Sequence, residues 1–333
     1  MSNQPDNRIP IWLDCDPGQD DLHAIIMCRF HPKLNLLGIT AVHGNTILEN
    51  TFKNASRVLK ACGVSTPNVY AGAEKPLLRE KENASHIHGV TGLDGSSLLP
   101  DADPTILQPG VNGIKAMADA ILASPQPVIV AAVGPVTNVA LLVSTFPEVK
   151  SNIREVLIMG GGIAFGNVTP VAEFNIYADP EALQVVLQAG LSRVVLVPLD
   201  CTHQCNYTSD VQQKFTDMAT PINPAFTQMI NELTAFVRKS YVGYGLDPND
   251  INWHDAIAVC HAIAPETFTD VPMYVSTIYG NKGPAEGQTV GDSRLLGGKS
   301  PNCLVAMKMD TDAFWVEMFE SWKLAAQSSK LTL

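Results

Sequence analysis

Four aspartates lie close together near the start of the chain, in "IWLDCDPGQDD" at residues 11–21. Asp14 and Asp16 end an apolar run, and Asp20 and Asp21 follow a Pro-Gly turn. Capping of a helix that begins there accounts for one or two of the four. Like charges a few ångströms apart destabilise a site unless a cation lies among them, and this stretch holds no Lys or Arg. Because all-oxygen ligands select a hard cation, the stretch favours a Ca²⁺ or Mg²⁺ site over capping alone.

A further acid comes late in the chain, in "INWHDAIAVCHAIAP" at residues 251–265. His254 and Asp255 open a helical pattern that stops before Pro265. Taken alone, Asp255 is best explained as an acid at the helix N-terminus and His254 as an exposed histidine. Both become site residues only if the fold brings them to the other acids.

The stretch "MGGGIAFGNVTPVAEFN", residues 159–175, follows another strand-like run. It does not meet the dinucleotide pattern Gly-x-Gly-x-x-Gly, because position 165 is Phe. Its glycines would equally let the backbone approach a small ligand. Asn167, Glu173 and Asn175 would then offer donors and acceptors suited to the hydroxyl groups of a sugar.

Two histidines stand in "HIHGVTGLDG", where His86 and His88 are two residues apart. That is the spacing of a metal-binding pair on a strand, but the glycines that follow favour a flexible loop. A loop above the site could bring His88 to a substrate.

The stretch "ELTAFVRKSYVGYGLDPNDIN", residues 232–252, is expected to be a mobile loop. It would carry Arg238, Tyr241 and Tyr244 towards a ligand. Aromatic rings there could stack on a planar ligand, and packing within the protein explains them about equally well.

A zinc site at "CTHQC" is the weaker explanation of Cys201, His203 and Cys205. A closed zinc site needs a fourth ligand, and no second pair lies nearby in the sequence. The seven cysteines are odd in number and widely spread, which suits free thiols in a reducing compartment.

The elements that must position these residues alternate between strand and helix. Strand-like runs occur at "IPIWLD", "LLGITAVHG", "PVIVAAVG", "EVLIMGGG" and "RVVLVPLD", with helical stretches that begin near Pro135, Asp179 and Ser209 among others. This order predicts an α/β fold: a single domain, residues 1–333, with a mostly parallel, Rossmann-like open sheet of about eight strands flanked by helices. Ligands bind beyond the carboxyl ends of such strands. The segments expected to meet there are 14–21, 43–45, 134–138, 160–175 and 200–203.

The stretch "STIYGNKGPAEGQTVGD" is interrupted by glycines and a proline. It is expected to form a C-terminal hairpin without catalytic residues.

The composition narrows the possible partners. The 333 residues are 46% hydrophobic and carry a net charge of −11 without a basic run. The sequence therefore lacks the clustered basic residues that are typical of proteins that bind nucleic acid or anionic lipid. No stretch reaches the ~18 apolar residues of a membrane span, and the first residues lack the pattern of a signal peptide. We expect a cytoplasmic protein with a small-molecule substrate.

Together these stretches resemble the inosine-uridine nucleoside hydrolase family. The resemblance rests on Asp-x-Asp-Pro-Gly-x-Asp-Asp after the first strand, Gly44-Asn45 after the second, and His254-Asp255 near the C-terminus, and it runs from about residue 9 to 320. It implies hydrolysis of the N-glycosidic bond of ribonucleosides of the uridine, inosine and cytidine type. It also implies a Ca²⁺ cofactor and a homodimer or homotetramer.

The resemblance also implies roles for single residues. Ca²⁺ would be bound by Asp16, Asp21, the backbone carbonyl of Thr137 and Asp255, and Asp16 would also accept a proton from water. Asp14 would be an acid that supports the calcium ligands. The expected substrate-binding residues around the ribose are Asp20, Asn45, Met159, Asn167, Glu173 and Asn175. On the base side the resemblance implies catalytic roles for His88 and His254, with Tyr241 close to the base.

Two other functions compete with this one. Haloacid dehalogenase-type phosphatases also place Asp-x-Asp after their first strand and use Mg²⁺, but they normally continue with Gly-Thr, whereas this chain continues with Pro17-Gly18 and two more aspartates. A non-catalytic nucleoside-binding protein would keep the same pocket. The intact set of expected catalytic positions argues against it.

Overall fold

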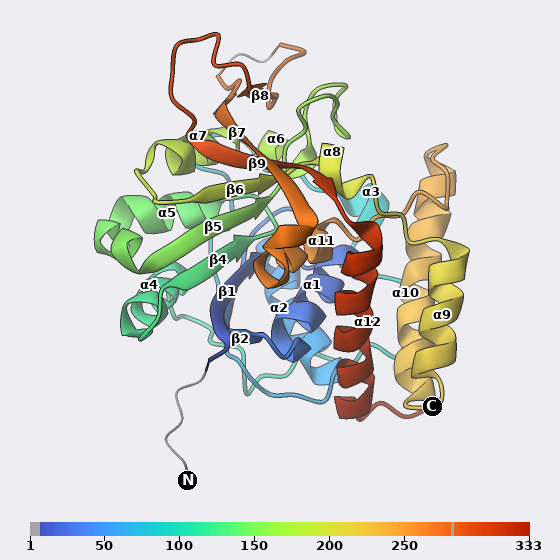
Figure 1. Ribbon diagram of the computed structural model, residues 1–333. Coiled ribbons are helices and arrows are strands. Elements are labelled where there is room, and N and C mark those ends of the chain that lie inside the picture. The colour runs from blue at the N-terminus through green and yellow to red at the C-terminus, as the bar shows by residue number, and fades with distance from the viewer. Residues whose placement is uncertain (1–6, 281–282) are drawn as a thin grey trace.

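The computed structural model describes residues 7–280 and 283–333. These residues form one nine-stranded sheet in the order β3-β2-β1-β4-β5-β6-β9-β7-β8 (Figure 1). Its strands are β1 (Ile9–Cys15), β2 (Leu34–Ala41), β3 (Val69–Ala71), β4 (Val128–Ala132), β5 (Ile153–Met159), β6 (Val194–Val197), β7 (Phe268–Thr277), β8 (Thr289–Asp292) and β9 (Cys303–Met309). All neighbouring pairs are parallel except those of β7 with β8 and β9. The predicted fold class is confirmed, with nine strands in place of about eight.

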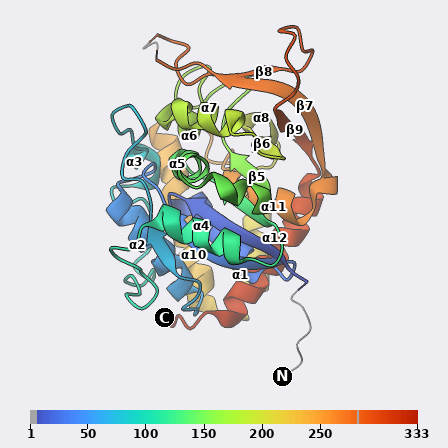
Figure 2. The same cartoon turned by 90° about the vertical axis from the view of Figure 1, so that its left-hand side faces the viewer.

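Helices cover both faces of the sheet (Figures 1 and 2). One face carries α1 (Gln19–Phe30), α2 (Leu48–Ala61), α11 (His254–Ile263) and α12 (Thr311–Ser328), and the other carries α4 (Gly113–Ala123), α5 (Thr137–Thr145) and α7 (Pro180–Gln188). Outside the first face lie α9 (Ser209–Ala219) and α10 (Pro224–Gly243), which pack on each other. The short helices are α3 (Ser85–His88), α6 (Phe174–Ala178), α8 (Leu199–Thr202), η1 (Pro147–Asn152) and η2 (Pro265–Thr267). No described helix has the length and apolar character that crossing a membrane requires.

The sheet separates two apolar cores because successive side chains of a strand point to opposite faces. In β1, Ile11 and Leu13 join the core under α1 and α11, whereas Trp12 joins the core under α4 and α5. The central strands β1 and β4 are therefore largely apolar and buried along most of their length, as expected of a parallel sheet. Their polar residues are left for the strand ends.

Most sequence-based boundaries agree with the structure. The helices expected near Pro135, Asp179 and Ser209 are α5, α7 and α9, and Asp179 caps α7 by accepting a hydrogen bond from the Ala182 amide at 3.1 Å. The expected C-terminal hairpin is β7 with β8. Residues 281–282, which lie between these two strands in the sequence, and residues 1–6 are outside the described residues. The expected absence of a signal peptide falls on residues 1–6 and stays a prediction.

The mobile loop expected at residues 232–252 is wrong for its first half. Helix α10 continues to Gly243, because Leu233 and Val237, four residues apart, are buried on one helix face. Arg238 does not reach a ligand site either. Its guanidinium donates to the carbonyl oxygens of Pro248 and, at 3.0 Å, Tyr207.

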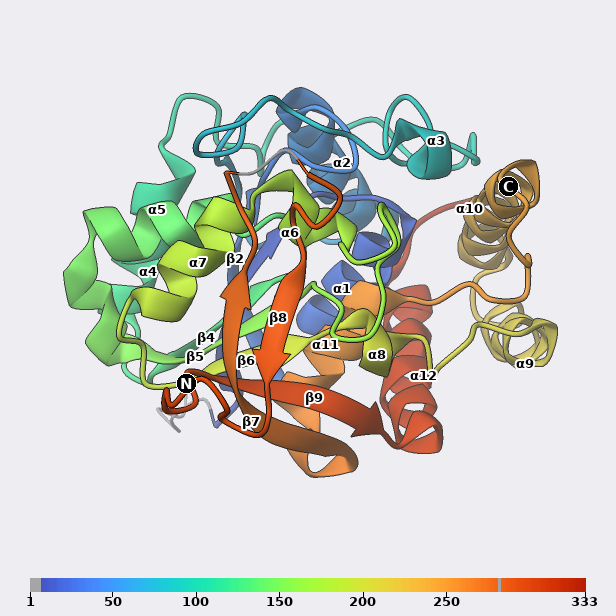
Figure 3. The same ribbon diagram turned by 90° about the horizontal axis from the view of Figure 1, so that it is seen from above.

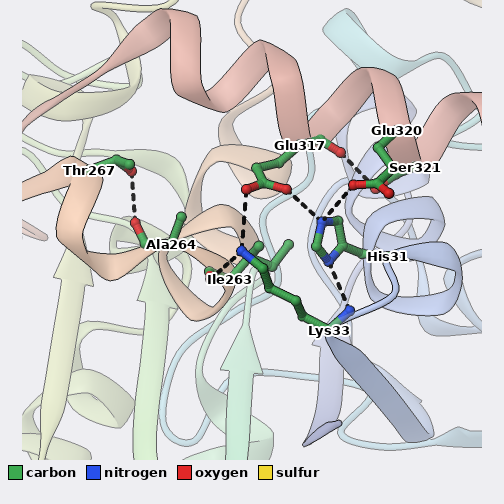
Figure 4. A network of polar contacts seen from close by, with 8 residues as sticks. All are labelled: His31, Lys33, Ile263, Ala264, Thr267, Glu317, Glu320 and Ser321. Atoms are coloured by element: carbon green, nitrogen blue, oxygen red, sulfur yellow. Dashed lines mark hydrogen bonds and ion pairs between the residues drawn. The ribbon is translucent and has the colours of Figure 1, made fainter.

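A polar cluster ties the end of α1 to α12 (Figure 4). The His31 Nδ1 atom accepts a hydrogen bond from the Lys33 amide at 3.3 Å, so its Nε2–H donates to Glu317 at 2.7 Å. The Lys33 ammonium lies 3.4 Å from the same carboxylate. His31, Glu317 and Glu320 lie close enough to hold a metal ion, but the Nε2 proton of His31 and the charge of Lys33 already satisfy Glu317. We interpret the cluster as a structural connection between the end of α1 and α12.

Gly38 of β2 provides a test of this packing. A Cβ atom there would lie 2.3 Å from Cζ3 of Trp12, whose indole is buried and donates to Thr40 Oγ1 at 3.1 Å. We expect Gly38→Ala to lower the free energy of unfolding by about 1–3 kcal/mol, measured by chemical denaturation. Gly243→Ala is the control, because a Cβ atom there meets nothing within 4 Å and should cost no stability. Equal unfolding midpoints for the two variants would contradict this packing argument.

Candidate active site

A cavity of about 340 Å³ opens at the carboxyl ends of the central strands. It brings together residues from distant parts of the sequence, as the α/β arrangement predicts. The sequence-predicted residues that line it are Asp16, Asp20, Asn45, His88, Met159, Asn167, Glu173, Asn175, Tyr241, Tyr244, His254 and Asp255. Helices α3 and α10 lie side by side along one wall (Figure 3).

Three carboxylates form a compact acidic cluster. Asp20, Asp21 and Asp255 each offer an oxygen atom within 4.8 Å of the others. Asp21 lies behind the cavity surface, where its two oxygens accept the backbone amides of Asp16 at 3.0 Å and Gly18 at 2.9 Å. The capping explanation is thus correct for Asp21, which closes the start of α1 while it also faces the cluster.

The Asp16 carboxylate is held between two glycines. A Cβ atom on Gly44 would lie 2.0 Å from Asp16 Oδ2, and one on Gly134 would lie 2.4 Å from Oδ1. Only glycine leaves room for the carboxylate at both positions. Asp16 Oδ2 also accepts the Asn45 amide at 2.7 Å, so the turns after β2 and β4 both fix its orientation.

The charges of this cluster are not balanced by the protein. Burial, followed by the charge of Asp21, raises the pKa of Asp16 well above its usual range, and burial together with Asp20 raises the pKa of Asp21 to about 8. Burial and the neighbouring acids raise the pKa of Asp255 as well. Within residues 7–280 and 283–333 no Lys or Arg pairs with these groups, and the buried Oδ1 atom of Asp20 has no hydrogen-bond partner. The donor set, all oxygen and unneutralised, fits a hard divalent cation.

Asp14 lies one layer deeper than the cluster. It is fully buried within β1 and accepts hydrogen bonds from Thr40 and, at 2.7 Å, from Asn138 Nδ2. Burial raises its pKa to about 7. Asp14 does not line the cavity, and it connects β1 to β2 and to the start of α5.

The structure does not bring Thr137 to the cavity. Thr137 is the first residue of α5, where its carbonyl is directed along the helix, and its hydroxyl donates to Asp179 at 2.7 Å. The cavity is lined instead by Val133, which directly follows β4. The carbonyl oxygen of Val133 accepts a hydrogen bond from Asn175 Nδ2 at 2.8 Å, which turns it towards the site.

A polar part of the cavity wall is built around Glu173. Its carboxylate accepts the backbone amides of Gly161, Asn175 and Ile176 at 2.8, 2.9 and 3.1 Å. Asn175 Nδ2 also contacts the carbonyl oxygen of Met159 at 3.2 Å. These bonds lock the side chains before any ligand arrives, so the wall is preorganised.

Two histidines, His88 and His254, also line the cavity. Burial lowers the pKa of His88, and burial followed by the charges of His203 and His88 lowers the pKa of His254 to about 3. Thr202 Oγ1 lies 2.7 Å from His254 Nδ1, and Gln19 Oε1 lies 2.8 Å from His88 Nδ1. Each ring is therefore held through one nitrogen.

Several lining residues carry no expectation from the sequence. Gln19, Asn252 and Trp253 are all buried and line the cavity. Gln19 is an uncharged amide among the acids of residues 14–21, and this was the feature of the sequence that could have indicated it. Its hydrogen-bond partners lie about 70 residues away in the sequence, so no local pattern reveals them.

The zinc alternative is not supported. The metal-capable groups found among the described residues do not include Cys201, His203 or Cys205, and the seven cysteines are free thiols.

Comparisons with known proteins show the family to which this chain belongs. Residues 11–316 match the family described as inosine-uridine preferring nucleoside hydrolase. The pyrimidine-specific ribonucleoside hydrolase RihB of Escherichia coli is 38% identical over 306 residues, which cover 92% of this chain and 94% of RihB.

Solved structures show the same similarity. The purine-preferring ribonucleoside hydrolase from Gardnerella vaginalis superposes with a TM-score of 0.85 at 27% identity, covering 96% of this chain and 99% of that one. An inosine-guanosine nucleoside hydrolase gives a TM-score of 0.82 at 26% identity, covering 94% and 98%. The chain therefore belongs to the inosine-uridine preferring nucleoside hydrolase family and is a ribonucleoside hydrolase, an enzyme that acts on N-glycosyl bonds.

Proposed function

We propose that this enzyme hydrolyses ribonucleosides of the uridine, inosine and cytidine type in a calcium-dependent reaction, with Asp16 as the general base. The observation that carries the proposal is the unbalanced acid cluster, which opens onto a cavity with one polar wall and one histidine-bearing wall. A ribose suits the polar wall, and a nucleobase suits the other.

The proposed ligands of Ca²⁺ are Asp16, Asp21, Asp255 and the carbonyl oxygen of Val133. Val133 replaces Thr137 in this set, because it lines the cavity and Thr137 does not. Asp20, which the sequence assigns to the ribose, also lies within the acidic cluster. When bound, Ca²⁺ would balance the carboxylate charges and lower the pKa of a water molecule.

The protein side chains have separate roles in proton transfer and in binding the ribose. Asp16, fixed between Gly44 and Gly134, accepts the proton of the attacking water. Asp20 and Asn45 hold the ribose hydroxyls, and the negative surroundings favour the electron-poor sugar of an oxocarbenium-like transition state. Asn167, Glu173 and Asn175 grip the far side of the ribose above Met159. This wall orients the sugar without having to reorganise.

His254 is assigned to the departing base. A purine leaves with help from a hydrogen-bond or proton donor at its ring, whereas a pyrimidine leaves more readily through its own carbonyl. We therefore expect His254→Ala to lower kcat for inosine about 10²–10³-fold and to lower kcat for uridine less, measured as released ribose. Equal losses for the two substrates would remove this role. Tyr241 and His88 complete the base side of the cavity.

A substrate panel tests the proposal as a whole. Inosine, uridine, cytidine and adenosine are scored for free base and ribose, and 5′-nucleotides are scored for phosphate. Release of base supports the proposal, whereas phosphate release without base would support the phosphatase alternative. Binding without turnover would support the non-catalytic alternative. The panel also measures the preferred base, for which the relatives differ: RihB is named pyrimidine-specific and the Gardnerella enzyme purine-preferring. Cytoplasmic location and assembly as a homodimer or homotetramer stay predictions.

A further inference from the structure

Gln19 connects the acidic turn to the loop that carries His88. Its side chain is 2% exposed, and its amide group makes three contacts. Nε2 lies 3.0 Å from the carbonyl oxygen of Asp94 and 3.3 Å from that of His88, and Oε1 lies 2.8 Å from His88 Nδ1. The Gln19 side chain, from α1, thus holds both ends of the segment 88–94.

These contacts determine which way the amide group points. A backbone carbonyl can only accept a hydrogen bond, so two carbonyl oxygens on one side require the –NH₂ of Gln19 there. The Oε1 atom must then face His88. Because Oε1 can only accept, the proton of this hydrogen bond belongs to His88 Nδ1.

The ring of His88 is also packed tightly against the turn. A Cβ atom on Gly18 would lie 2.4 Å from His88 Nδ1 and 2.8 Å from Cε1. The ring therefore lies directly on the glycine and has little freedom to flip. Among the residues that the structure describes, His88 Nε2 has no hydrogen-bond partner, and the His88 side chain lines the cavity.

We propose that Gln19 is a positioning residue that holds His88 as the Nδ1–H tautomer, so that Nε2 accepts a hydrogen bond from a donor group of the bound nucleoside. The hydrogen bond made by one ring nitrogen decides the tautomer of the other. The identity of the ligand rests on the proposed function, whereas the tautomer does not.

A purely structural role for Gln19 has a different signature. The same loop has anchors that do not involve Gln19, since Val90 O accepts from Thr46 Oγ1 at 3.1 Å and Asn54 Nδ2 donates to Thr91 O at 2.7 Å. Asn50 Nδ2 also donates to Val90 O, at 3.3 Å. Asn50→Ala therefore loosens the loop without touching the ring, and it serves as the matched control.

The first experiment observes the tautomer directly. In ¹⁵N-histidine-labelled protein at neutral pH, the His88 signals are identified by their loss in His88→Phe. We expect the wild type and Asn50→Ala to show Nδ1–H, and Gln19→Leu, which has no acceptor, to shift towards Nε2–H. Gln19→Glu, which keeps an acceptor, should retain Nδ1–H. An unchanged Nδ1–H pattern in Gln19→Leu would overturn the proposal.

The second experiment is a double-mutant cycle in the full-length enzyme. We expect Gln19→Leu to lower kcat/KM by about 10–100-fold in the wild-type background. In a His88→Ala background it should lower kcat/KM by less than about twofold, because the group it positions is gone. An undiminished loss in that background would mean that Gln19 acts through the acids or the loop, and would overturn the proposal. The tautomer measurement needs no turnover, so a wild type that releases no ribose would overturn the proposed function separately.

Discussion

Asp16→Asn is expected to lower the rate of ribose release by roughly 10³–10⁴-fold while a non-hydrolysable ribose analogue still binds. The asparagine side chain has nearly the same shape, and its Oδ1 can still accept the Asn45 amide that holds Asp16 in place. An amide cannot accept the proton of the attacking water. The loss should therefore fall on kcat, measured as reducing sugar released, and binding measured by calorimetry should change little.

The matched control is Asp310→Asn. Asp310 caps α12 by accepting the Ala313 amide at 3.1 Å and is not among the residues that line the cavity. It can be replaced by Asn because both residues are good N-caps. Its activity should equal that of the wild type. A near-normal rate in Asp16→Asn would show that Asp16 is not the base.

Removal of divalent metal is expected to lower activity at least about a hundredfold, with recovery on addition of Ca²⁺. The physical reason is the acid cluster, in which Asp20, Asp21 and Asp255 approach one another without a cationic side chain among the described residues. Repulsion within this cluster leaves it poorly arranged for a substrate when no cation is bound.

The same cluster predicts a change in stability. A cation that binds only the folded state raises the free energy of unfolding by about 2.7 kcal/mol at a concentration one hundred times its Kd. The melting temperature of the chelated enzyme should therefore rise as Ca²⁺ is added, and Asp21→Asn should weaken this response. Mg²⁺ should replace Ca²⁺ poorly, because it demands near-octahedral geometry at shorter distances. Full activity after exhaustive chelation would contradict the metal role.

Much of the fold follows from local patterns. The alternation of apolar runs with helical stretches predicts a parallel open sheet, since each strand is buried on both faces and each connection must cross over it. The failure at residues 232–252 has a local cause. The buried positions Leu233 and Val237, four residues apart, continue α10 to Gly243, so only the residues after Gly243 leave the helix.

The gathering of the site follows from the same topology. Asp16, Asn45 and Glu173 come after three different strands, and the carboxyl ends of parallel strands meet at one edge. Asp255 is less determined, because it starts a helix that packs on α1 and not a segment that follows a strand. Only the family resemblance indicated its place.

The sequence by itself thus determined which residue types meet beyond the strands: unbalanced acids, a polar set suited to a sugar, and histidines. The tertiary structure decided which atoms face the cavity. It placed Val133 at the cavity in place of Thr137, because a carbonyl directly after β4 still points outward whereas one inside α5 is directed along the helix. It also gave Gln19 a partner in His88, 69 residues away, because that pairing depends on a loop packed against Gly18 and not on any local pattern.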